Sequence, residues 1–339
     1  MTQQPFIIIG ENIHCTRSRL TNGSFVTELA GGRYGLVFKD GTATRTLPVP
    51  EAIVAGEEWA NGKVRHVAVA VWQGLYGQGA EQAVALDYIR AMARDQEEAG
   101  AAYLDLNVDE FSTDNDEKLR AVVWAVNLLQ EASPLPVSVD SSNLEIIRAG
   151  VKACNPNRSK PLVNSVSLER VDAISIAAES GAGVVAGAGG ASGMPENMEE
   201  RLANTAVLMA MLEEHGLARN DIYLDPLVYP VSVKAENSLD VLETIRELRH
   251  IYGPDIHFAP GISNISFGLP KRPLINQVFA RLCREHGCDG GIVDPRQING
   301  SLLDSLDTES IAYRLTADLL LGRDEYGMEY ISATRDGTI

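Results

Sequence analysis

The chain has 339 residues, of which 45% are hydrophobic and 22% charged, a composition typical of a folded globular protein. Its formal net charge of -17 would repel nucleic acids and anionic membrane surfaces, so neither is an expected partner. The apolar runs are too short to span a bilayer, and the amino-terminal stretch turns polar too early for a signal peptide. The cysteines Cys15, Cys154, Cys283 and Cys288 follow no disulfide pattern, so we expect a cytoplasmic protein.

Short apolar runs alternate with amphipathic stretches along most of the chain, a pattern typical of βαβ units and a parallel sheet. Two of the expected helices have clear helical spacing, residues 81–100 and residues 238–253. The runs that predict buried strands are residues 6–11, 101–108, 136–141, 161–167, 181–189, 221–226, 257–264 and 290–295. This number of strand and helix repeats predicts an α/β fold, a (β/α)8 TIM barrel in which residues 1–339 form one domain.

Residues 16–78 interrupt the alternation after the first predicted strand. The stretch YGLVFKDGTATRTLPV predicts a β-hairpin with an Asp-Gly turn, and KVRHVAVAVW alternates as a strand does. We therefore expect a β-rich insertion, and loops after barrel strands lie on the catalytic face. Trp59, Trp72 and Tyr76 favour a docking surface for a partner protein, the alternative being that they form the insertion's own small core.

Two other motifs have simpler interpretations. The stretch GAGVVAGAGGASG falls at the fifth strand without G-x-G-x-x-G spacing, so it predicts close approach of backbone and ligand rather than a nucleotide site. Cys283, His286 and Cys288 lie close together, but zinc sites usually need a second pair of ligands. We interpret the two cysteines as buried side chains beside a surface histidine and expect no metal site.

Polar side chains recur where the predicted strands end, which is where barrel enzymes place their chemistry. A single Asp there is usually a cap or turn residue, and Asp140 fits that role best because SVDSSN leads into a helix. Asp105 and Asp225 lie between apolar neighbours in YLDLN and YLDPL, and a buried carboxylate needs a dedicated donor. The full set is Glu11, Asn12, Asp105, Asn107, Asp140, Asn143, Asn164, Asp225, Asn264 and Asp294.

This set of carboxylates and amides suits a pterin. The ring N–H and amino groups of an amino-pyrimidinone edge match the two acceptor oxygens of a carboxylate. Asn side chains serve the mixed donors and acceptors on the rest of the ring.

The motifs GENIH, YLDLNV, SVDSSN, LVNSVSLER, YLDPL and GISNISFGLPKRPLIN occur in this order. They resemble the motifs of the methyltetrahydrofolate:corrinoid methyltransferases and of the folate module of cobalamin-dependent methionine synthase. The resemblance covers residues 1–14 and the chain from residue 80 onward, and SNISFGLPKRPLIN is its most specific part. It departs in the first motif, where the family usually reads G-E-R-x-N and this chain has Asn12 and His14. The insertion is also foreign to compact members of the family.

The resemblance implies methyl transfer, in either direction, between N5 of tetrahydrofolate and the cobalt of a corrinoid. Tetrahydrofolate or 5-methyltetrahydrofolate would be a substrate, and the corrinoid would be free cobalamin or held by a corrinoid-binding protein. Asp105 and Asn264 are the expected catalytic residues, with Asn264 near N5 and no metal bound by the protein, and we expect a homodimer. The residues expected to contact the folate are Asp105, Asn107, Asn143, Asn164, Asp225, Asn264 and Arg272.

Two other functions remain alternatives on the sequence alone. A dihydropteroate synthase would share the pterin-binding barrel, but it needs a basic, Gly-containing loop after strand seven and an Arg-x-His pattern after strand eight. This chain has SNISFG and VDPRQI there. A non-catalytic pterin or corrinoid carrier would use the same Asp and Asn residues, because binding and catalytic residues coincide in such a site.

Overall fold

The computed structural model describes residues 5–339 and contains eight parallel strands in a nearly closed barrel with helices between them. The strand order is β12-β11-β10-β9-β8-β7-β1-β13, which confirms the predicted (β/α)8 fold. The first four residues of the expected 1–339 domain lie outside the described residues. All eight predicted strands are present, as β1 Ile7–His14, β7 Tyr103–Asn107, β8 Val137–Asp140, β9 Leu162–Val166, β10 Gly183–Gly187, β11 Ile222–Asp225, β12 His257–Phe258 and β13 Gly290–Val293.

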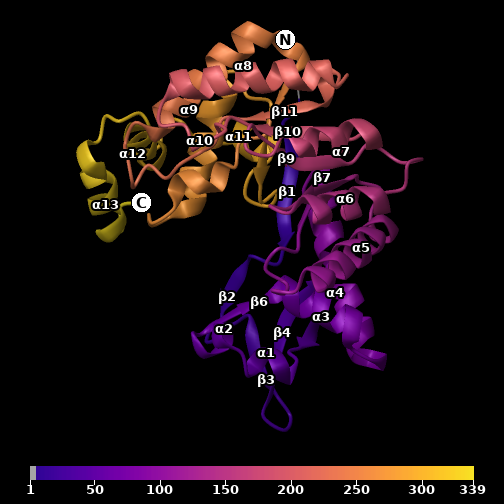
Figure 1. Cartoon of the computed structure of the whole chain (residues 1–339). Helices are drawn as coiled ribbons and strands as arrows, with labels where there is room; N and C mark the ends of the chain where they lie inside the picture. The colour runs from indigo at the N-terminus through magenta and orange to yellow at the C-terminus, as the bar shows by residue number, and fades with distance from the viewer. Residues whose placement is uncertain (1–4) are drawn as a thin grey trace. The chain divides into compact units, whose positions relative to one another are not determined.

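The chain divides into two compact units. The first comprises the residues up to Ile9 together with Val163–Ile339, and the second comprises Gly10–Leu162. In the first unit β10 and β11 pair in parallel up to Gly187↔Asp225, and Figure 1 shows helices α8 and α9 lying side by side near these strands. The helices of this unit are α7 Asp172–Ser180, α8 Met198–Glu214, α9 Asn237–Tyr252, α10 Arg272–Glu285, α11 Gly300–Asp304, α12 Ile311–Leu320 and α13 Met328–Arg335.

One aspartate joins three strands at their amino ends in the first unit. The Asp289 carboxylate lies 2.8 Å from His257 Nδ1 and accepts a hydrogen bond from Phe258 N at 2.9 Å. Its backbone carbonyl accepts from Ile7 N at 2.7 Å, and Arg249 pairs with the carboxylate at 3.1 Å. Since barrel enzymes place their chemistry at the opposite, carboxyl ends of the strands, we assign this group to stability.

The second unit contains β7 and β8, which pair in parallel up to Asn107↔Asp140. Helix α4 (Gly79–Glu98) confirms the helix predicted over residues 81–100, as α9 confirms the one predicted over 238–253. Gly100 follows α4 with a φ of 92°, a left-handed conformation that glycine adopts without steric cost at the end of a helix. The two other long helices are α5 Asn115–Ala132 and α6 Leu144–Ala153.

The β-rich insertion is also present in the second unit. Strands β3 (Val26–Leu29), β4 (Arg33–Asp40) and β5 (Ala43–Pro48) form an antiparallel sheet, and the pair Asp40↔Ala43 closes the predicted hairpin. Two further short strands pair with each other, β2 Ser18–Leu20 and β6 Lys63–Arg65. The short helices between the two sheets are α1 Glu51–Val54 and α2 Glu57–Ala60.

The expectation of a strand throughout KVRHVAVAVW was wrong beyond Arg65. Residues His66–Tyr76 form helix α3, whose first six residues, His66 to Val71, are all buried. A helix that is buried on every side has no polar face, so its sequence lacks the three- and four-residue periodicity that identifies an amphipathic helix. The alternation of Val and Ala was therefore not a sign of one exposed and one buried face.

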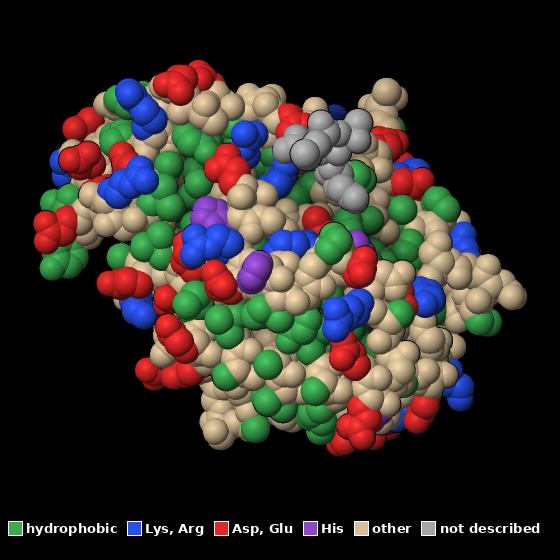
Figure 2. Space-filling view, turned by 90° about the horizontal axis from the view of Figure 1, so that it is seen from above, with side chains coloured by type: hydrophobic (Ala, Val, Ile, Leu, Met, Phe, Trp, Pro, Cys, Tyr) green, Lys and Arg blue, Asp and Glu red, His purple; other side chains and the backbone are tan. Residues whose placement is uncertain are grey.

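The surface agrees with the acidic composition. Figure 2 shows acidic and basic side chains interspersed with hydrophobic ones over the face in view, so positive charge is not gathered there. No helix of the described residues has both the length and the apolar character needed to cross a membrane.

Gly290, at the start of β13, lies where the backbone of two other strands comes closest. A Cβ atom there would meet Ile7 O at 2.6 Å and Phe258 O at 2.7 Å, and main-chain carbonyls yield less easily than the end of a flexible side chain. We expect Gly290→Ala to lower the free energy of unfolding by about 1–3 kcal/mol, the usual cost of overpacking, measured by urea denaturation. Gly300→Ala is the control, because nothing lies within 4 Å of its Cβ position. Equal stability of the two variants would contradict the prediction.

Candidate functional site

In the second unit, β1, β7 and β8 bring together His14, Asp105 and Asp140. His14 Nε2 lies 2.8 Å from Asp105 Oδ2, and one side-chain atom from each of the three residues lies within 4.8 Å of the other two. The side chain of Asp105 is 0% exposed and that of His14 is 12% exposed. The donor that a buried Asp105 carboxylate requires is thus supplied, at least in part, by an imidazole of the same chain.

The charges of this cluster shift the pKa values of its members. Burial lowers the pKa of His14, but the hydrogen bond to Asp105 and the charges of Asp105, Asp140 and Glu11 outweigh burial, so the pKa is raised. Burial and the charge of Asp105 raise the pKa of Asp140 to about 7, against the opposing effects of His14 and Asn107. The cluster therefore retains protons at pH values where an ordinary carboxyl group has lost its own.

Asp140 is not the cap of the following helix, and that expectation was wrong. The cap of α6 is Asn143, whose Oδ1 accepts from Glu145 N at 2.8 Å and whose Nδ2 donates to Asn115 Oδ1 at 2.8 Å. Asp140 instead accepts from Asn107 Nδ2 at 2.9 Å. The SVDSSN motif does provide a cap, but three residues after the aspartate.

The spacing within the cluster raises the question of a metal ion, since an imidazole and two carboxylates are common ligands. In the structure these atoms are joined by direct hydrogen bonds, from His14 to Asp105 and from Asn107 to Asp140. Asn107 is itself fixed, because its Oδ1 accepts from Asp109 N at 3.0 Å. We therefore describe the cluster as a partly buried network of hydrogen bonds and charge interactions that holds protons.

In the first unit, Asp225 ends β11. Its Oδ1 accepts from Leu227 N at 2.9 Å, and Gly261 N is a second backbone donor. Burial raises the pKa of Asp225 to about 6, although these two hydrogen bonds and the charge of Arg201 lower it. Two half-buried carboxyl groups of the predicted set, Asp140 and Asp225, therefore titrate closer to neutral pH than an ordinary aspartate.

Arg201, on α8, holds the turn that follows Asp225. Its side chain is 0% exposed, and it donates from Nε to Pro226 O at 2.8 Å and from Nη2 to Leu227 O at 3.3 Å. Its guanidinium group also lies 4.9 Å from the centre of the Tyr229 ring. Sequence reasoning missed Arg201, because an arginine within a helix is mostly exposed and only the tertiary contact shows otherwise.

Asn264 lies on the short helical turn η3 (Ile262–Ser266) and is exposed. Its amide Nδ2 is 3.1 Å from the position that a Cβ of Gly261 would take. Gly261 thus leaves space for the Asn264 amide and also donates its N–H to Asp225. The first unit therefore brings Asn264 and Asp225 into one neighbourhood through a single glycine.

Arg272 and Asn164 are the remaining predicted residues of the first unit. Arg272 donates from Nε to Ser266 Oγ at 3.0 Å and from Nη2 to Ser263 O at 2.8 Å, so it braces the turn that carries Asn264. Asn164 lies on β9 and is 7% exposed.

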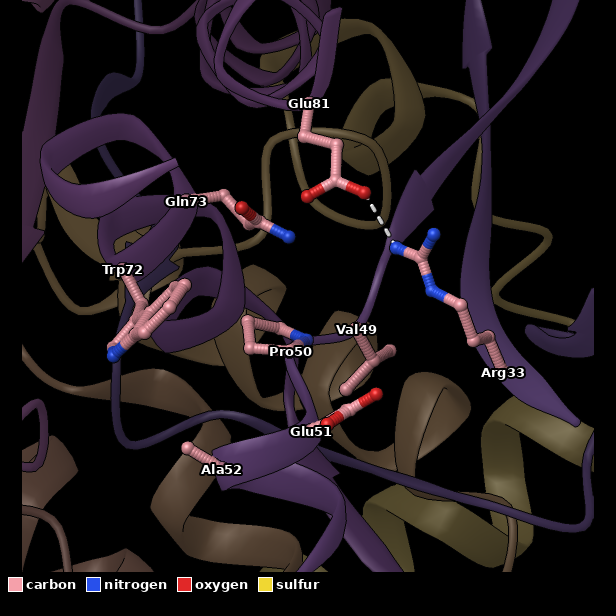
Figure 3. A pocket seen from close by; sticks show the side chains of 8 residues that line it. All are labelled: Arg33, Val49, Pro50, Glu51, Ala52, Trp72, Gln73 and Glu81. Carbon is pink, nitrogen blue, oxygen red and sulfur yellow. Dashed lines mark hydrogen bonds and ion pairs between the residues drawn. The ribbon is translucent and has the colours of Figure 1, made fainter. Parts of the chain in front are cut away.

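The insertion contains a separate cavity of about 410 Å³. Figure 3 shows Arg33 and Glu81 joined by an ion pair on one side of the cavity, with Trp72 and Gln73 on another. Gln73 Nε2 donates to Pro48 O at 3.0 Å. The cavity is lined entirely by residues of the second unit.

The three aromatic residues expected to dock a partner have contacts within the chain. Trp59 packs against Tyr34 with ring centroids 4.9 Å apart, and Trp72 packs against Tyr76 at 5.6 Å. The Tyr76 hydroxyl also donates to Glu117, although Tyr76 remains 40% exposed. These contacts favour the alternative in which the aromatic residues stabilise the insertion.

Comparison with known proteins gives matches to both the sequence and the fold. Residues 78–294 match the model of a family described as pterin binding enzyme. A methylcorrinoid:tetrahydrofolate methyltransferase of Eubacterium limosum is 34% identical over 260 residues, covering 74% of this chain and 89% of that protein. A methionine synthase of Mycobacterium tuberculosis is 30% identical over 235 residues, which cover 64% of this chain but 19% of that protein.

Among solved structures, a dihydropteroate synthase of Stenotrophomonas maltophilia is similar in fold. The TM-score is 0.51 at 17% identity, covering 70% of this chain and 86% of that one. At this identity the likeness concerns the fold alone.

The raised pKa of Asp140 predicts a pH-dependent contribution to stability. The unfolded chain binds this proton with the ordinary pKa of 3.8, whereas the folded chain binds it with a pKa of about 7. The contribution is therefore fully present below about pH 4 and is lost as the pH rises through about 7. In urea denaturation, we expect Asp140→Asn to gain about 1–3 kcal/mol of unfolding free energy relative to the unchanged protein between about pH 5 and about pH 8.

Asp255→Asn is the control for this measurement, because it removes an exposed carboxylate. The same measurement on Asp255→Asn shows what removal of an exposed carboxylate alone does to the unfolding free energy. A difference between Asp140→Asn and the unchanged protein that stays constant with pH would show that this carboxyl group has no raised pKa in the folded chain.

Proposed function

The chain belongs to the family of pterin binding enzymes and, within it, to the methyltransferases that act on tetrahydrofolate and a corrinoid, and on this premise we propose that it moves a methyl group between N5 of tetrahydrofolate and the cobalt of a corrinoid. The observation that carries the proposal is a pair of carboxylates, Asp105 and Asp225, each on a barrel strand and each held by hydrogen bonds. Carboxylates held in this way match the N–H groups of a pterin edge.

We propose that the folate contacts the residues that the sequence indicated, within one pterin-binding barrel into which residues 16–78 are inserted. A carboxylate has about four lone-pair positions, so Asp105 and Asp225 retain acceptor capacity beyond their contacts within the chain. Asn107 and Asn143 already use their amide groups on neighbouring residues, which makes them supports of the site as well as ligands. The proposed set is Asp105, Asn107, Asn143, Asn164, Asp225, Asn264 and Arg272.

The proposed chemistry assigns a hydrogen-bonding role to Asn264. A methyl group on a tertiary amine is a poor electrophile, so N5 must gain positive character before a strong nucleophile such as Co(I) removes the methyl group. Asn264 is exposed on a turn that Arg272 braces, which leaves its amide accessible to a ligand. We assign it the stabilisation of protonated N5, and no nucleophile from the protein is required.

The corrinoid is proposed to arrive on a corrinoid-binding protein. The relative from Eubacterium limosum is named for a methylcorrinoid, and a corrinoid is too large for a closed pocket. A lower KM for carrier-borne than for free cobalamin would support such a partner.

We also propose that the enzyme is a homodimer. The carboxyl-terminal segment supports this, because Tyr326, Met328 and Ile331 are 86%, 66% and 41% exposed, and large apolar side chains gathered on a surface often mark an interface. Sedimentation equilibrium measures the oligomeric state.

The pterin assignment predicts that loss of a carboxylate weakens folate binding. We expect Asp225→Asn to reduce the affinity for tetrahydrofolate or 5-methyltetrahydrofolate by about 1.5–3 kcal/mol, the scale of a hydrogen bond to a charged group, measured by calorimetry. Asp105→Asn is expected to act in the same direction, and Asp255→Asn serves as a control. Unchanged affinity in both of the first two variants would contradict the pterin assignment.

The role of Asn264 predicts an effect on turnover that exceeds the effect on binding. We expect Asn264→Ala to lower the methyl transfer rate roughly ten- to a thousandfold, the range for one lost transition-state hydrogen bond, with a smaller change in folate affinity. Turnover with a reduced corrinoid measures this and also distinguishes an enzyme from a carrier. Ser263→Ala, in the same turn, is the control, and normal turnover of Asn264→Ala would place the activation of N5 elsewhere.

A further inference from the structure

The contact between His14 and Asp105 joins two strands that are neighbours in the barrel. His14 is the last residue of β1 and Asp105 lies within β7, with β1 beside β7 in the strand order. The 2.8 Å separation of Nε2 and Oδ2 is that of a charge-assisted hydrogen bond. This contact at Oδ2 restricts the orientation of the Asp105 carboxylate.

The charged groups around His14 favour a protonated imidazole. Asp105 faces it from β7, Asp140 from β8 and Glu11 from β1. Glu11 is also paired with Arg17 at 2.7 Å, which compensates part of its charge. Asp105 and Asp140 both raise the pKa of His14 through their charges, and burial makes an uncompensated carboxylate costly.

The asparagine Asn107 adds a constraint on the same network. It donates to Asp140 Oδ2 at 2.9 Å and accepts from Asp109 N at 3.0 Å, so its amide orientation is fixed by the backbone. Asn107 thus holds Asp140 in place, and the charge of Asp140 acts on His14.

We infer, building on the proposed function, that His14 is a positioning residue for folate binding, which donates from Nε2 to Asp105 and so orients this carboxylate toward the N–H groups of the pterin. No bond forms or breaks at His14. Its effect on the folate passes entirely through Asp105.

This role makes folate affinity depend on the proton of His14. As the pH rises through the raised pKa of His14, the donor loses its charge, and a neutral imidazole is a weaker partner for Asp105 than an imidazolium. The affinity of the unchanged enzyme is therefore expected to fall on the alkaline side. A glutamine at position 14 has an N–H donor that reaches the position of Nε2 but does not titrate, so it separates the hydrogen bond from the charge.

The test measures the dissociation constant of tetrahydrofolate by calorimetry from about pH 6 to about pH 9, in the unchanged enzyme and in His14→Ala and His14→Gln. We expect His14→Ala to weaken binding roughly ten- to a hundredfold near pH 7, corresponding to one charged hydrogen bond. His14→Gln is expected to recover part of this affinity and to lose the alkaline decline. In turnover assays, both variants should raise the KM for folate by a larger factor than they lower kcat.

His250→Gln is the matched control, because it removes an exposed histidine and should preserve the pH profile. Absence of folate binding by the unchanged enzyme would contradict the proposed function itself. Folate binding with the same affinity and alkaline decline in His14→Gln and the unchanged enzyme would overturn only the role of His14. Folate binding that requires added zinc, or that EDTA abolishes, would overturn it in favour of a metal ion at this cluster.

Discussion

A carboxylate that is removed from water must be hydrogen-bonded, and the two carboxylates proposed to bind the pterin satisfy this requirement in different ways. Asp105 lies against the imidazole of His14, a group that titrates. Asp225 accepts from the backbone N–H groups of Leu227 and Gly261, which do not. The two acceptors proposed for one ligand class therefore differ in how they respond to pH.

The surroundings of Asp225 illustrate how much structure one backbone donor requires. Leu227 donates to the carboxylate from a backbone with a φ of 62°, a conformation that is rare for residues with a side chain. Buried Arg201 donates hydrogen bonds to the carbonyl oxygens of Pro226 and Leu227, on either side of this N–H. The Leu227 side chain lies 3.7 Å from the position that a Cβ of Gly187 would take. The glycine-rich strand β10 thus accommodates this turn, whereas its sequence predicted only a close approach of backbone and ligand.

The elements that could be predicted from the sequence are those with local signals. Eight apolar runs gave the strands, helical spacing gave α4 and α9, and an Asp-Gly turn gave the β4–β5 hairpin. Helix α3 was missed because burial on all sides removes its periodicity. Asp105 and Asp225 were selected because barrel enzymes place polar residues where strands end. Their partners lie elsewhere in the chain, and His14 is 91 residues from Asp105. Such pairings depend on strand order, which no local pattern contains.

The presence of an imidazole beside buried carboxylates is itself an argument about function. Burying an ion pair costs desolvation energy that the attraction between the charges only partly offsets, so apolar residues of similar volume often stabilise a core equally well. Asp140, with a pKa raised to about 7, shows that this cost is present in the cluster. The network lies toward the carboxyl ends of the strands, where barrel enzymes place their chemistry. The Asp289 group, in contrast, joins strands at their amino ends. A charged cluster that costs stability is expected at the carboxyl ends of the strands if a ligand, rather than the fold, requires its charges.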